Sequence, residues 1–322
     1  FNTGAPNLAK PSSSFKQFFT PVTKTDKTAG GWEYYLEKPS VGARTMTSSS
    51  NGPLEQLNLT NNIVDHMWYS TFIPKDETIV DKSLLNIQGR DGTELSSIVI
   101  INNTIHVLSS AMGLKNGGET PHDGKGISLE NGGPTYNHHS LMNQSWISTW
   151  MIPGEHLQIF DPSTTHLVHW ESTSKNNNVS KSSAIWFRGM LNTPLTTINT
   201  HQLDPIVSSS PPQIAYALNL TCMWKGTAYV NGFLLGRYWM VGGTCKGECA
   251  PPIKDGHCYM HWKDCGKPTQ TLYHIPTSIL KNDGTKNLVV LFEEVDVPPI
   301  GAPNQNERDV NSVDIVMLTG HP

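Results

Sequence analysis

The pattern of apolar and polar positions along the chain predicts short β-strands and almost no helix. The segments 67–73, 146–152, 156–160 and 313–318 carry apolar side chains at alternating positions or in short apolar runs. Such spacing places apolar side chains on one face of a pleated strand. Only 276–280, which begins with proline, predicts a short helical turn.

Two hairpins are predicted from the turn residues between neighbouring strands. Asn231-Gly232 separates the apolar runs 228–230 and 233–235. A type I′ turn needs a positive φ at both central residues, and Asn-Gly is the pair that adopts it most readily. Asn102-Asn103 predicts a second hairpin in the same way, between 97–101 and 104–108.

The pattern of the first half returns in the second half. The segment 185–190 (IWFRGM) resembles 67–72 (MWYSTF), with Trp68 and Trp186 at matching positions. Two similar β-units in tandem predict an all-β fold with two β-sandwiches after an irregular N-terminal segment with few strands. The expected boundaries are 1–60 for the irregular segment, 61–184 for the first sandwich and 185–322 for the second.

Aromatic side chains gather around the Asn231-Gly232 hairpin and predict a carbohydrate-binding surface. Flat aromatic rings beside a few planar hydrogen-bonding groups are typical of saccharide sites. The candidates are Trp224, Arg237, Tyr238, Trp239 and Trp262. The alternative is that the aromatic residues beside the hairpin strands, above all Trp224 and Trp239, are simply packed in the core, and for each of these residues the pattern favours that interpretation.

The composition favours a loop-rich β protein and argues against several classes of partner. Charged residues make up 16% of the chain, which holds 27 glycines and 22 prolines. The net charge is −4 without any run of Arg or Lys, so we expect no nucleic-acid partner. No apolar segment approaches the about 20 residues that span a bilayer, so we expect no membrane association. The chain begins at Phe1 without Met or a signal peptide, so we expect a processed N-terminus or a longer upstream chain.

Sequons and cysteines predict passage through the secretory pathway. Glycosylation is predicted at Asn58, Asn102, Asn143, Asn178 and Asn219. Two disulfides are predicted among Cys245, Cys249, Cys258 and Cys265, whose pairing the spacing leaves open. The nearby His257 and His261 make a zinc site the alternative, although no C-x₂-C pair is present. The fifth cysteine, Cys222, is predicted to be a buried free thiol.

No catalytic residue and no bound metal or cofactor is predicted. A retaining glycosidase places two carboxylates ~5–5.5 Å apart across one sugar. Glu293 and Glu294 are adjacent on a predicted strand, so their side chains point to opposite faces and cannot share one glycosidic bond. The glycine-rich loop 113–133 contains Asp123 but lacks the clustered acids that Ca²⁺ needs.

Six stretches together carry a family resemblance: FNTG at 1–4, LEQLNLT at 54–60, DHMWYSTF at 65–72, GTAYVNGFLLGRYW at 226–239, CGKPTQTLYHIPTSIL at 265–280 and NLVVLFEE at 287–294. They resemble the C-terminal, post-barrel region of the plant-type β-galactosidases of glycoside hydrolase family 35, and they occur in the order of that family. The resemblance implies that the two tandem β-sandwiches are jelly-roll-like, of the galactose-binding-domain-like kind.

The resemblance implies a non-catalytic region that supports a catalytic (β/α)₈ barrel and contacts a galactoside or another glycan. The barrel, with its two catalytic glutamates, would belong to the same protein or to a cleaved companion chain, so no activity is expected from this chain alone. The four clustered cysteines match those of the family, which favours disulfides. The implied location is secreted, lysosomal or vacuolar. The alternative is an independent, lectin-like carbohydrate-binding protein, and a purely structural interaction module remains a third class.

Overall fold

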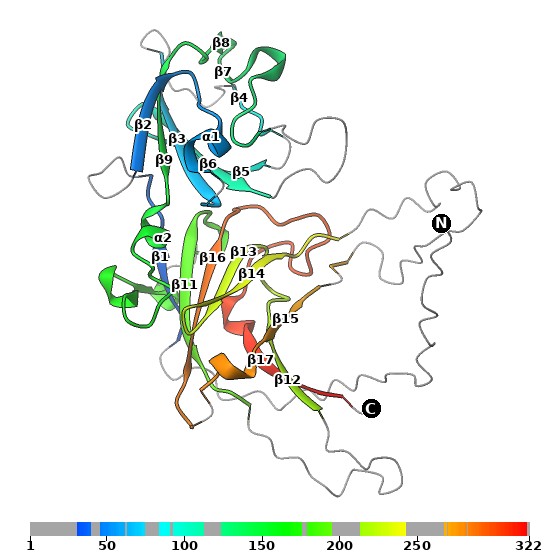
Figure 1. The fold of residues 1–322 in the computed structure, drawn as a ribbon. Helices are drawn as coiled ribbons and strands as arrows, with labels where there is room; N and C mark the ends of the chain where they lie inside the picture. The colour runs from blue at the N-terminus through cyan, green and yellow to red at the C-terminus, as the bar shows by residue number, and fades with distance from the viewer. Residues whose placement is uncertain are drawn as a thin grey trace, which may run out of the picture.

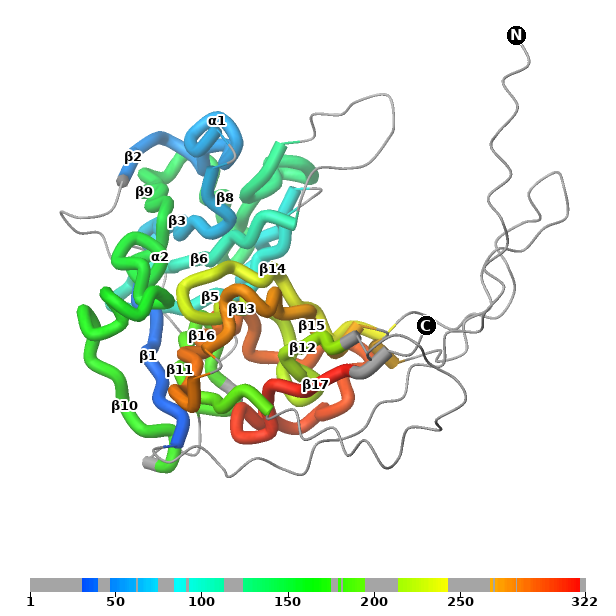
Figure 2. The backbone as a smooth tube through the Cα atoms, turned by 60° about the horizontal axis from the view of Figure 1, so that its bottom comes forward, coloured from blue at the N-terminus to red at the C-terminus, as the bar shows by residue number. Residues whose placement is uncertain are grey.

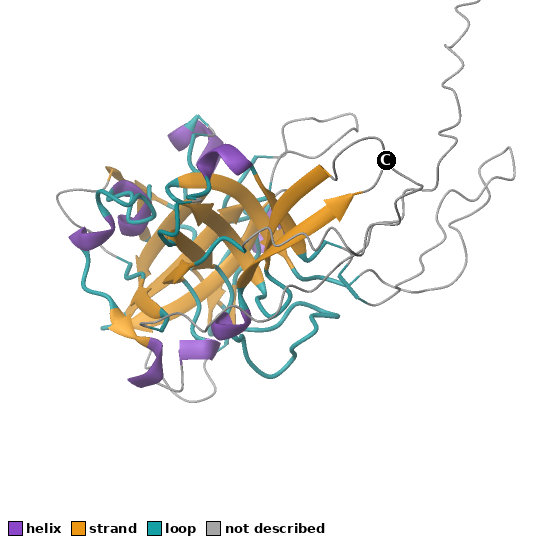
Figure 3. Cartoon of the chain, turned by 90° about the horizontal axis from the view of Figure 1, so that it is seen from below, coloured by secondary structure: helices purple, strands orange, loops and turns teal. Residues whose placement is uncertain are grey.

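A computed structural model gives the arrangement of most of the chain. It describes residues 31–39, 46–61, 63–74, 84–90, 93–112, 124–175, 179–194, 213–242, 267–268, 270–281 and 283–320. Within these ranges the regular structure is almost entirely antiparallel β-sheet, with two short α-helices, α1 (Gln56–Thr60) and α2 (Pro153–His156), and a few 3₁₀ turns at the periphery (Figure 3). The all-β prediction is therefore confirmed.

One sandwich is built from a six-stranded and a three-stranded sheet (Figure 1). The order in the larger sheet is β10 (Glu171–Ser172), β1 (Glu33–Leu36), β11 (Ile185–Leu191), β16 (Asn287–Glu293), β13 (Lys225–Val230) and β14 (Phe233–Trp239). The order in the smaller sheet is β15 (Leu272–Ile275), β12 (Gln213–Asn219) and β17 (Asp314–Gly320).

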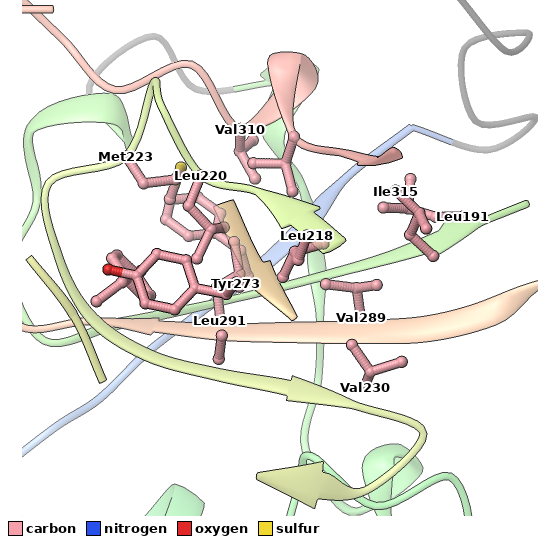
Figure 4. Packing of buried hydrophobic residues seen from close by; sticks show 14 of the residues in the cluster. Leu191, Leu218, Leu220, Met223, Val230, Tyr273, Val289, Leu291, Val310 and Ile315 are labelled. Atoms are coloured by element: carbon pink, nitrogen blue, oxygen red, sulfur yellow. The ribbon is translucent and has the colours of Figure 1, made fainter. Parts of the chain in front are cut away.

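The core of this sandwich lies between its two sheets. The inward side chains come from alternate strand positions, because successive side chains of a strand point to opposite faces. Leu218 and Ile315 of the smaller sheet pack against Val230, Val289 and Leu291 of the larger one, and all five are buried (Figure 4). Every residue of β16 is buried, and this strand (NLVVLFE) is therefore a nearly continuous apolar run.

The other sandwich has the same two-layer plan. Its five-stranded sheet has the order β2 (Met46–Asn51), β9 (Ser145–Trp150), β3 (His66–Phe72), β6 (Thr104–Ala111) and β5 (Thr93–Ile101). Its three-stranded sheet has the order β4 (Leu85–Asn86), β7 (Thr135–Tyr136) and β8 (His139–Ser140). Met67, Tyr69 and Val107 of the larger sheet pack with Tyr136 of the smaller one to form the core.

A third apolar layer joins the two sandwiches. Trp68 of β3 and Trp186 of β11 both belong to it, each on a central strand of its own large sheet. Phe160 completes the layer by stacking on Tyr229 with ring centroids 4.1 Å apart. The two sandwiches therefore pack against each other through a buried contact, and the tube view shows α2 beside β1 and β9 at this level (Figure 2).

Both predicted hairpins are confirmed. β13 and β14 are joined by Asn231 and Gly232, whose φ values are 50° and 85°. β5 and β6 are joined by Asn102 and Asn103, with φ values of 48° and 60°. The short turn around 276–280 is also present, as a 3₁₀ turn at Thr277–Ile279 with Pro276 at its N-cap.

The prediction of a strand at 156–160 is wrong. Pro153 starts helix α2, and Gln158 then takes a positive φ of 51°, which ends any extended run. The apolar side chains of Ile159 and Phe160 nevertheless face inward, because they cover the outer face of the six-stranded sheet. Alternating apolar positions were correct evidence for burial but not for a strand.

The segment 1–60, expected to have few strands, contributes to both sandwiches in its described part. β1 pairs with β11 and β10, and β2 pairs with β9. The six-stranded sheet therefore takes strands from before residue 61 and from within 61–184. Pairing across such distances in sequence is a tertiary event that local patterns do not encode.

Candidate functional site

The two adjacent glutamates at the end of β16 point in opposite directions, as the strand geometry predicted. Glu293 faces the core of its own sandwich. Its Oε1 accepts hydrogen bonds from the backbone N–H of Trp224 at 3.0 Å and from the Tyr238 hydroxyl at 2.9 Å. Its Oε2 accepts from Nη1 of the buried Arg308 at 3.1 Å. All its donors come from the protein, so Glu293 is a structural anchor.

Glu294 faces the other sandwich and is surrounded by cations. Its Oε2 lies 2.7 Å from Lys225 Nζ, and its Oε1 lies 3.0 Å from Arg237 Nη2 and 3.1 Å from His66 Nε2. Burial by itself would raise the pKa of Glu294, but the His66 hydrogen bond and the three positive charges outweigh burial and hold this pKa far below its usual range. Glu294 is therefore ionised throughout the physiological range.

The ion pairs of Glu294 continue across to the first sandwich. Lys225 Nζ also lies 2.6 Å from Oε2 of Glu94 on β5, and His66 Nδ1 donates to Oε1 of Glu155 at 2.6 Å. Burial would lower the pKa of His66, but Glu155 and Glu294 outweigh that effect and raise it to about 9. At neutral pH His66 is therefore a buried imidazolium that joins two carboxylates from different parts of the fold.

A further buried carboxyl group lies beside this chain of charges. Glu37 follows β1, and its Oε2 accepts from Trp186 Nε1 at 2.6 Å and from the backbone N–H of Gly154 at 3.0 Å. Burial raises the pKa of Glu37 to about 8, and the two hydrogen bonds oppose this shift only in part. Glu37 is therefore mainly protonated at neutral pH.

These groups form a buried charge network between the two sandwiches, consisting of Glu37, His66, Glu94, Glu155, Lys225, Arg237 and Glu294. The network binds β3, β5 and α2 to β13, β14 and β16. Each carboxyl group of the network has at least one protein donor or cation as a partner, and Glu293 and Glu294 do not face a common site. This arrangement holds the two sandwiches together.

The structure separates the residues predicted to bind carbohydrate. Trp224 and Tyr238 are buried in the second sandwich, where they cannot stack against a sugar. Arg237 is held by Glu294 and by the backbone carbonyl of Ala111. Trp239 is 42% exposed, with Lys225 Nζ 5.5 Å from its ring centroid.

The interpretation that Trp239 packs in the core is therefore wrong. Trp239 follows Tyr238, and adjacent strand side chains point to opposite faces, so only one of the two can enter the core. Trp262 lies outside the described residues.

The predicted disulfide cysteines, Cys245, Cys249, Cys258 and Cys265, lie outside the described residues, as do His257, His261, Asp123 and the sequon residue Asn178. Cys222 is a free thiol of intermediate exposure, less buried than predicted.

Four sequon asparagines lie within the described ranges. Asn58, Asn102 and Asn143 are exposed, whereas Asn219 is half-buried and accepts hydrogen bonds from Thr221. Within the same ranges, every helix is too short or too polar to cross a bilayer.

The charge network was missed by sequence reasoning. One signal was present in the hairpin, where Lys225 and Arg237 flank the turn at positions that place both on the outer face of the sheet. His66 and Glu155 carry no local signal, because they meet only through the packing of distant strands.

Comparison with known proteins places the chain near one group of enzymes. The family described as "Beta-galactosidase, galactose-binding domain" matches residues 185–287. "Beta-galactosidase 8" from Arabidopsis thaliana is 29% identical over 100% of this chain and 39% of its own length. "Beta-galactosidase 10" from the same plant is 27% identical over 89% of this chain and 41% of its own length.

A more distant relative has a similar overlap. "Probable beta-galactosidase 2" from Dictyostelium discoideum is 25% identical over 82% of this chain and 37% of its own length. The chain thus spans about 40% of the length of the curated relatives it matches. The resemblance to plant-type β-galactosidases is confirmed: the chain is similar to these proteins over most or all of its length, residues 185–287 match the galactose-binding-domain model of that family, and the overlap is consistent with a C-terminal region of such a protein.

Proposed function

We propose that this chain is the non-catalytic β-sandwich region of a β-galactosidase-like glycoside hydrolase, and that it supports a catalytic (β/α)₈ barrel. The observation that carries the proposal is that 89–100% of the chain is similar to only about 40% of the length of two β-galactosidase relatives. The non-catalytic role is supported by the contacts of Glu293 and Glu294, because each carboxylate is bound by its own set of protein donors on its own side of the sheet.

The test is to assay the isolated chain and the longest encoded protein with a chromogenic β-galactoside. We expect turnover only from the longer protein. Turnover by the isolated chain that Glu294→Gln or Glu293→Gln abolishes, in a folded variant, would contradict the proposal, because those residues would then be catalytic.

A second candidate function is carbohydrate binding by the chain itself. The match to a domain described as galactose-binding and the exposed ring of Trp239 favour it. Binding of galactosides to the chain, measured by calorimetry, should be lost in Trp239→Ala if this residue forms the site. Binding by a protein with no barrel and no turnover would favour the lectin-like alternative.

We also propose that the chain is secreted or delivered to a lysosome or vacuole, as a glycoprotein with two disulfides among its four clustered cysteines. The sequons and the cysteine spacing support this. Intact mass of the natural protein should fall on deglycosylation, and alkylation should label four more cysteines after reduction than before. Four free thiols in the native protein would contradict the disulfide part.

A further inference from the structure

Helix α2 is wedged between the two sandwiches by contacts with both. The backbone N–H of Gly154 donates to Glu37 Oε2 at 3.0 Å, on the side of the six-stranded sheet. The next residue, Glu155, accepts from His66 of the five-stranded sheet at 2.6 Å. Gly154 lies so close to the Trp186 indole that an added Cβ would be 2.4 Å from Nε1. These few polar groups therefore lie within the contact between the sandwiches, beside its apolar layer.

Each of the two carboxyl groups has one buried oxygen that remains unpaired. Among the described residues, Glu37 Oε1 and Glu155 Oε2 have no hydrogen-bond partner. Two ionised carboxylates with buried, unpaired oxygens would be strongly unfavourable side by side. A neutral Glu37 removes one of the two charges, and its protonated oxygen is a donor as well as an acceptor.

We propose that the contact between the two sandwiches is a proton-dependent junction, in which Glu37 holds a buried proton beside Glu155 and His66 holds a second one between Glu155 and Glu294. Loss of these protons to solvent in alkaline solution places uncompensated negative charge in the layer between the sandwiches and loosens their contact.

The charged and titratable groups that face Glu37 support this assignment. Burial and the Glu155 charge together raise the pKa of Glu37 to about 8, against the opposing effects of the Trp186 and Gly154 hydrogen bonds and of His66. Tyr35, on β1, has its pKa raised to about 12 by burial and by Glu37, so it stays neutral over the relevant range.

His66 is surrounded by a separate set of groups. It contacts Glu155 and Glu294, and Arg237 Nη2 lies 3.2 Å from its Nε2. Lys225 forms one ion pair with Glu294 and another with Glu94. The remaining neighbours around Glu294 and Arg237 are Asp65, Lys125 and Tyr229. Loss of the His66 proton leaves Glu155 without a cation, because Lys225 and Arg237 are already paired with Glu294.

The direction of the pH dependence follows from the raised pKa values of Glu37 and His66. A group whose pKa is raised in the folded state contributes its full stability at pH values below its pKa in the unfolded chain. This stability is lost as the pH rises through its pKa in the folded chain. For Glu37 this loss runs from about pH 4.5 to about 8. For His66 it runs from about 6.5 to about 9. The junction is therefore most stable in mildly acidic solution.

The test is to measure thermal unfolding of the 322-residue chain between pH 5 and pH 9.5, together with Glu37→Gln and the control Glu130→Gln. Glutamine keeps the acceptor for Trp186 and Gly154 and replaces the unpaired oxygen of Glu37 by an amide N–H₂, which carries no charge to titrate. We expect the unfolding midpoint of the wild type to fall by at least about 5 °C over this range. The unfolding midpoint of Glu37→Gln should fall by a clearly smaller amount over the same pH range. The midpoint of Glu130→Gln, which changes an exposed residue, should follow that of the wild type.

Amide hydrogen exchange locates the effect. In the wild type, exchange corrected for the intrinsic rate should increase from pH 6 to pH 8.5 in peptides that cover α2 and β11, and it should increase less in Glu37→Gln. An alkaline decline that is identical in the wild type and in Glu37→Gln would overturn the proposal, and so would a wild type whose stability is constant from pH 5 to 9.5.

Infrared spectroscopy of the wild type gives a result even if Glu37→Gln does not fold. A protonated-carboxyl band that titrates with a midpoint near pH 8 is expected. Its absence would contradict the proposal directly.

Discussion

Arg308 shows how one side chain can fix the inside of the second sandwich. Its Nη1 donates to Glu293 Oε2 at 3.1 Å and to the Val295 carbonyl at 2.8 Å, and its guanidinium lies 4.8 Å from the ring centroid of Trp224. The side chain is 1% exposed and that of Glu293 is fully buried. Removing one partner of such a pair leaves the other charge buried and uncompensated.

We therefore expect Arg308→Met to lower the free energy of unfolding by about 3–5 kcal/mol. The control is Arg188→Met, which removes a partly exposed ion pair with Glu33 and should cost about 1 kcal/mol. Urea denaturation monitored by tryptophan fluorescence measures both. Adding Glu293→Gln to Arg308→Met should recover part of the loss, and equal losses for Arg308→Met and Arg188→Met would refute the argument.

The tryptophans of the hairpin region offer a matched pair of substitutions. Trp224 is 1% exposed and donates from Nε1 to the Asn304 carbonyl, whereas Trp239 is 42% exposed. Trp224→Ala should cost about 3–5 kcal/mol of unfolding free energy, because it leaves a cavity and an unpaired carbonyl. Trp239→Ala should cost less than about 1 kcal/mol. Denaturation midpoints in the reverse order would show that Trp239 is the core residue.

Among the elements, the two asparagine hairpins have the same turn but different surroundings. Asn231 Nδ2 donates to the Ile279 carbonyl and to Asn287 Oδ1, and its Oδ1 accepts from the Leu288 N–H at 2.9 Å. Asn102 is exposed and takes a similar backbone conformation, with a φ of 48°. One turn is therefore tied to the sheet beside it, and the other is held mainly by its own strands.

Asn231→Ala should consequently be more harmful than Asn102→Ala. Both replacements place alanine at a positive φ, which costs about 1–2 kcal/mol. Asn231→Ala also removes three hydrogen bonds worth about 1 kcal/mol each. Unfolding of unglycosylated protein by urea distinguishes the two, and similar losses would mean that the tertiary hydrogen bonds of Asn231 contribute little.

At the scale of the whole molecule, the charge network limits stability on the acid side through Glu294. A carboxylate whose pKa is lowered in the folded state contributes stability above its unfolded value, and this is lost as the pH falls toward the folded value. The pKa of Glu294 in the folded protein lies far below its ordinary value of about 4.5, so its contribution to stability is lost only below that pH. The alkaline loss of Glu37 begins at about pH 4.5 and that of His66 at about 6.5, so these three groups together give a stability maximum near pH 4.5.

Glu294→Gln tests the acid limb. At pH 6 it should lower the free energy of unfolding by about 3–5 kcal/mol, because Lys225 and Arg237 lose their central anion. The difference from the wild type should narrow as the pH falls below about 4.5. Glu307→Gln, an exposed change, is the control and should match the wild type throughout. A difference that stays constant down to pH 3 would contradict the lowered pKa.

Local patterns in the sequence determined the strands, the two hairpins and the opposite directions of Glu293 and Glu294. A strand alternates its side chains, and an Asn-Gly or Asn-Asn pair accepts a positive φ, whatever the rest of the chain does. The matching positions of Trp68 and Trp186 in two similar segments were likewise visible in the sequence, and both side chains are buried in the layer between the sandwiches. These features depend only on a few neighbouring residues.

The tertiary structure alone decided which faces were covered and by what. Tyr238 and Trp239 are equally aromatic, and only the position of the three-stranded sheet places the first in the core and leaves the second exposed. The run 156–160 is apolar enough for a strand, yet it folds as a cover for another sheet. His66 and Glu37 acquired their pKa values from partners distant in sequence, because burial and the surrounding charges are properties of the packed molecule and not of the local chain.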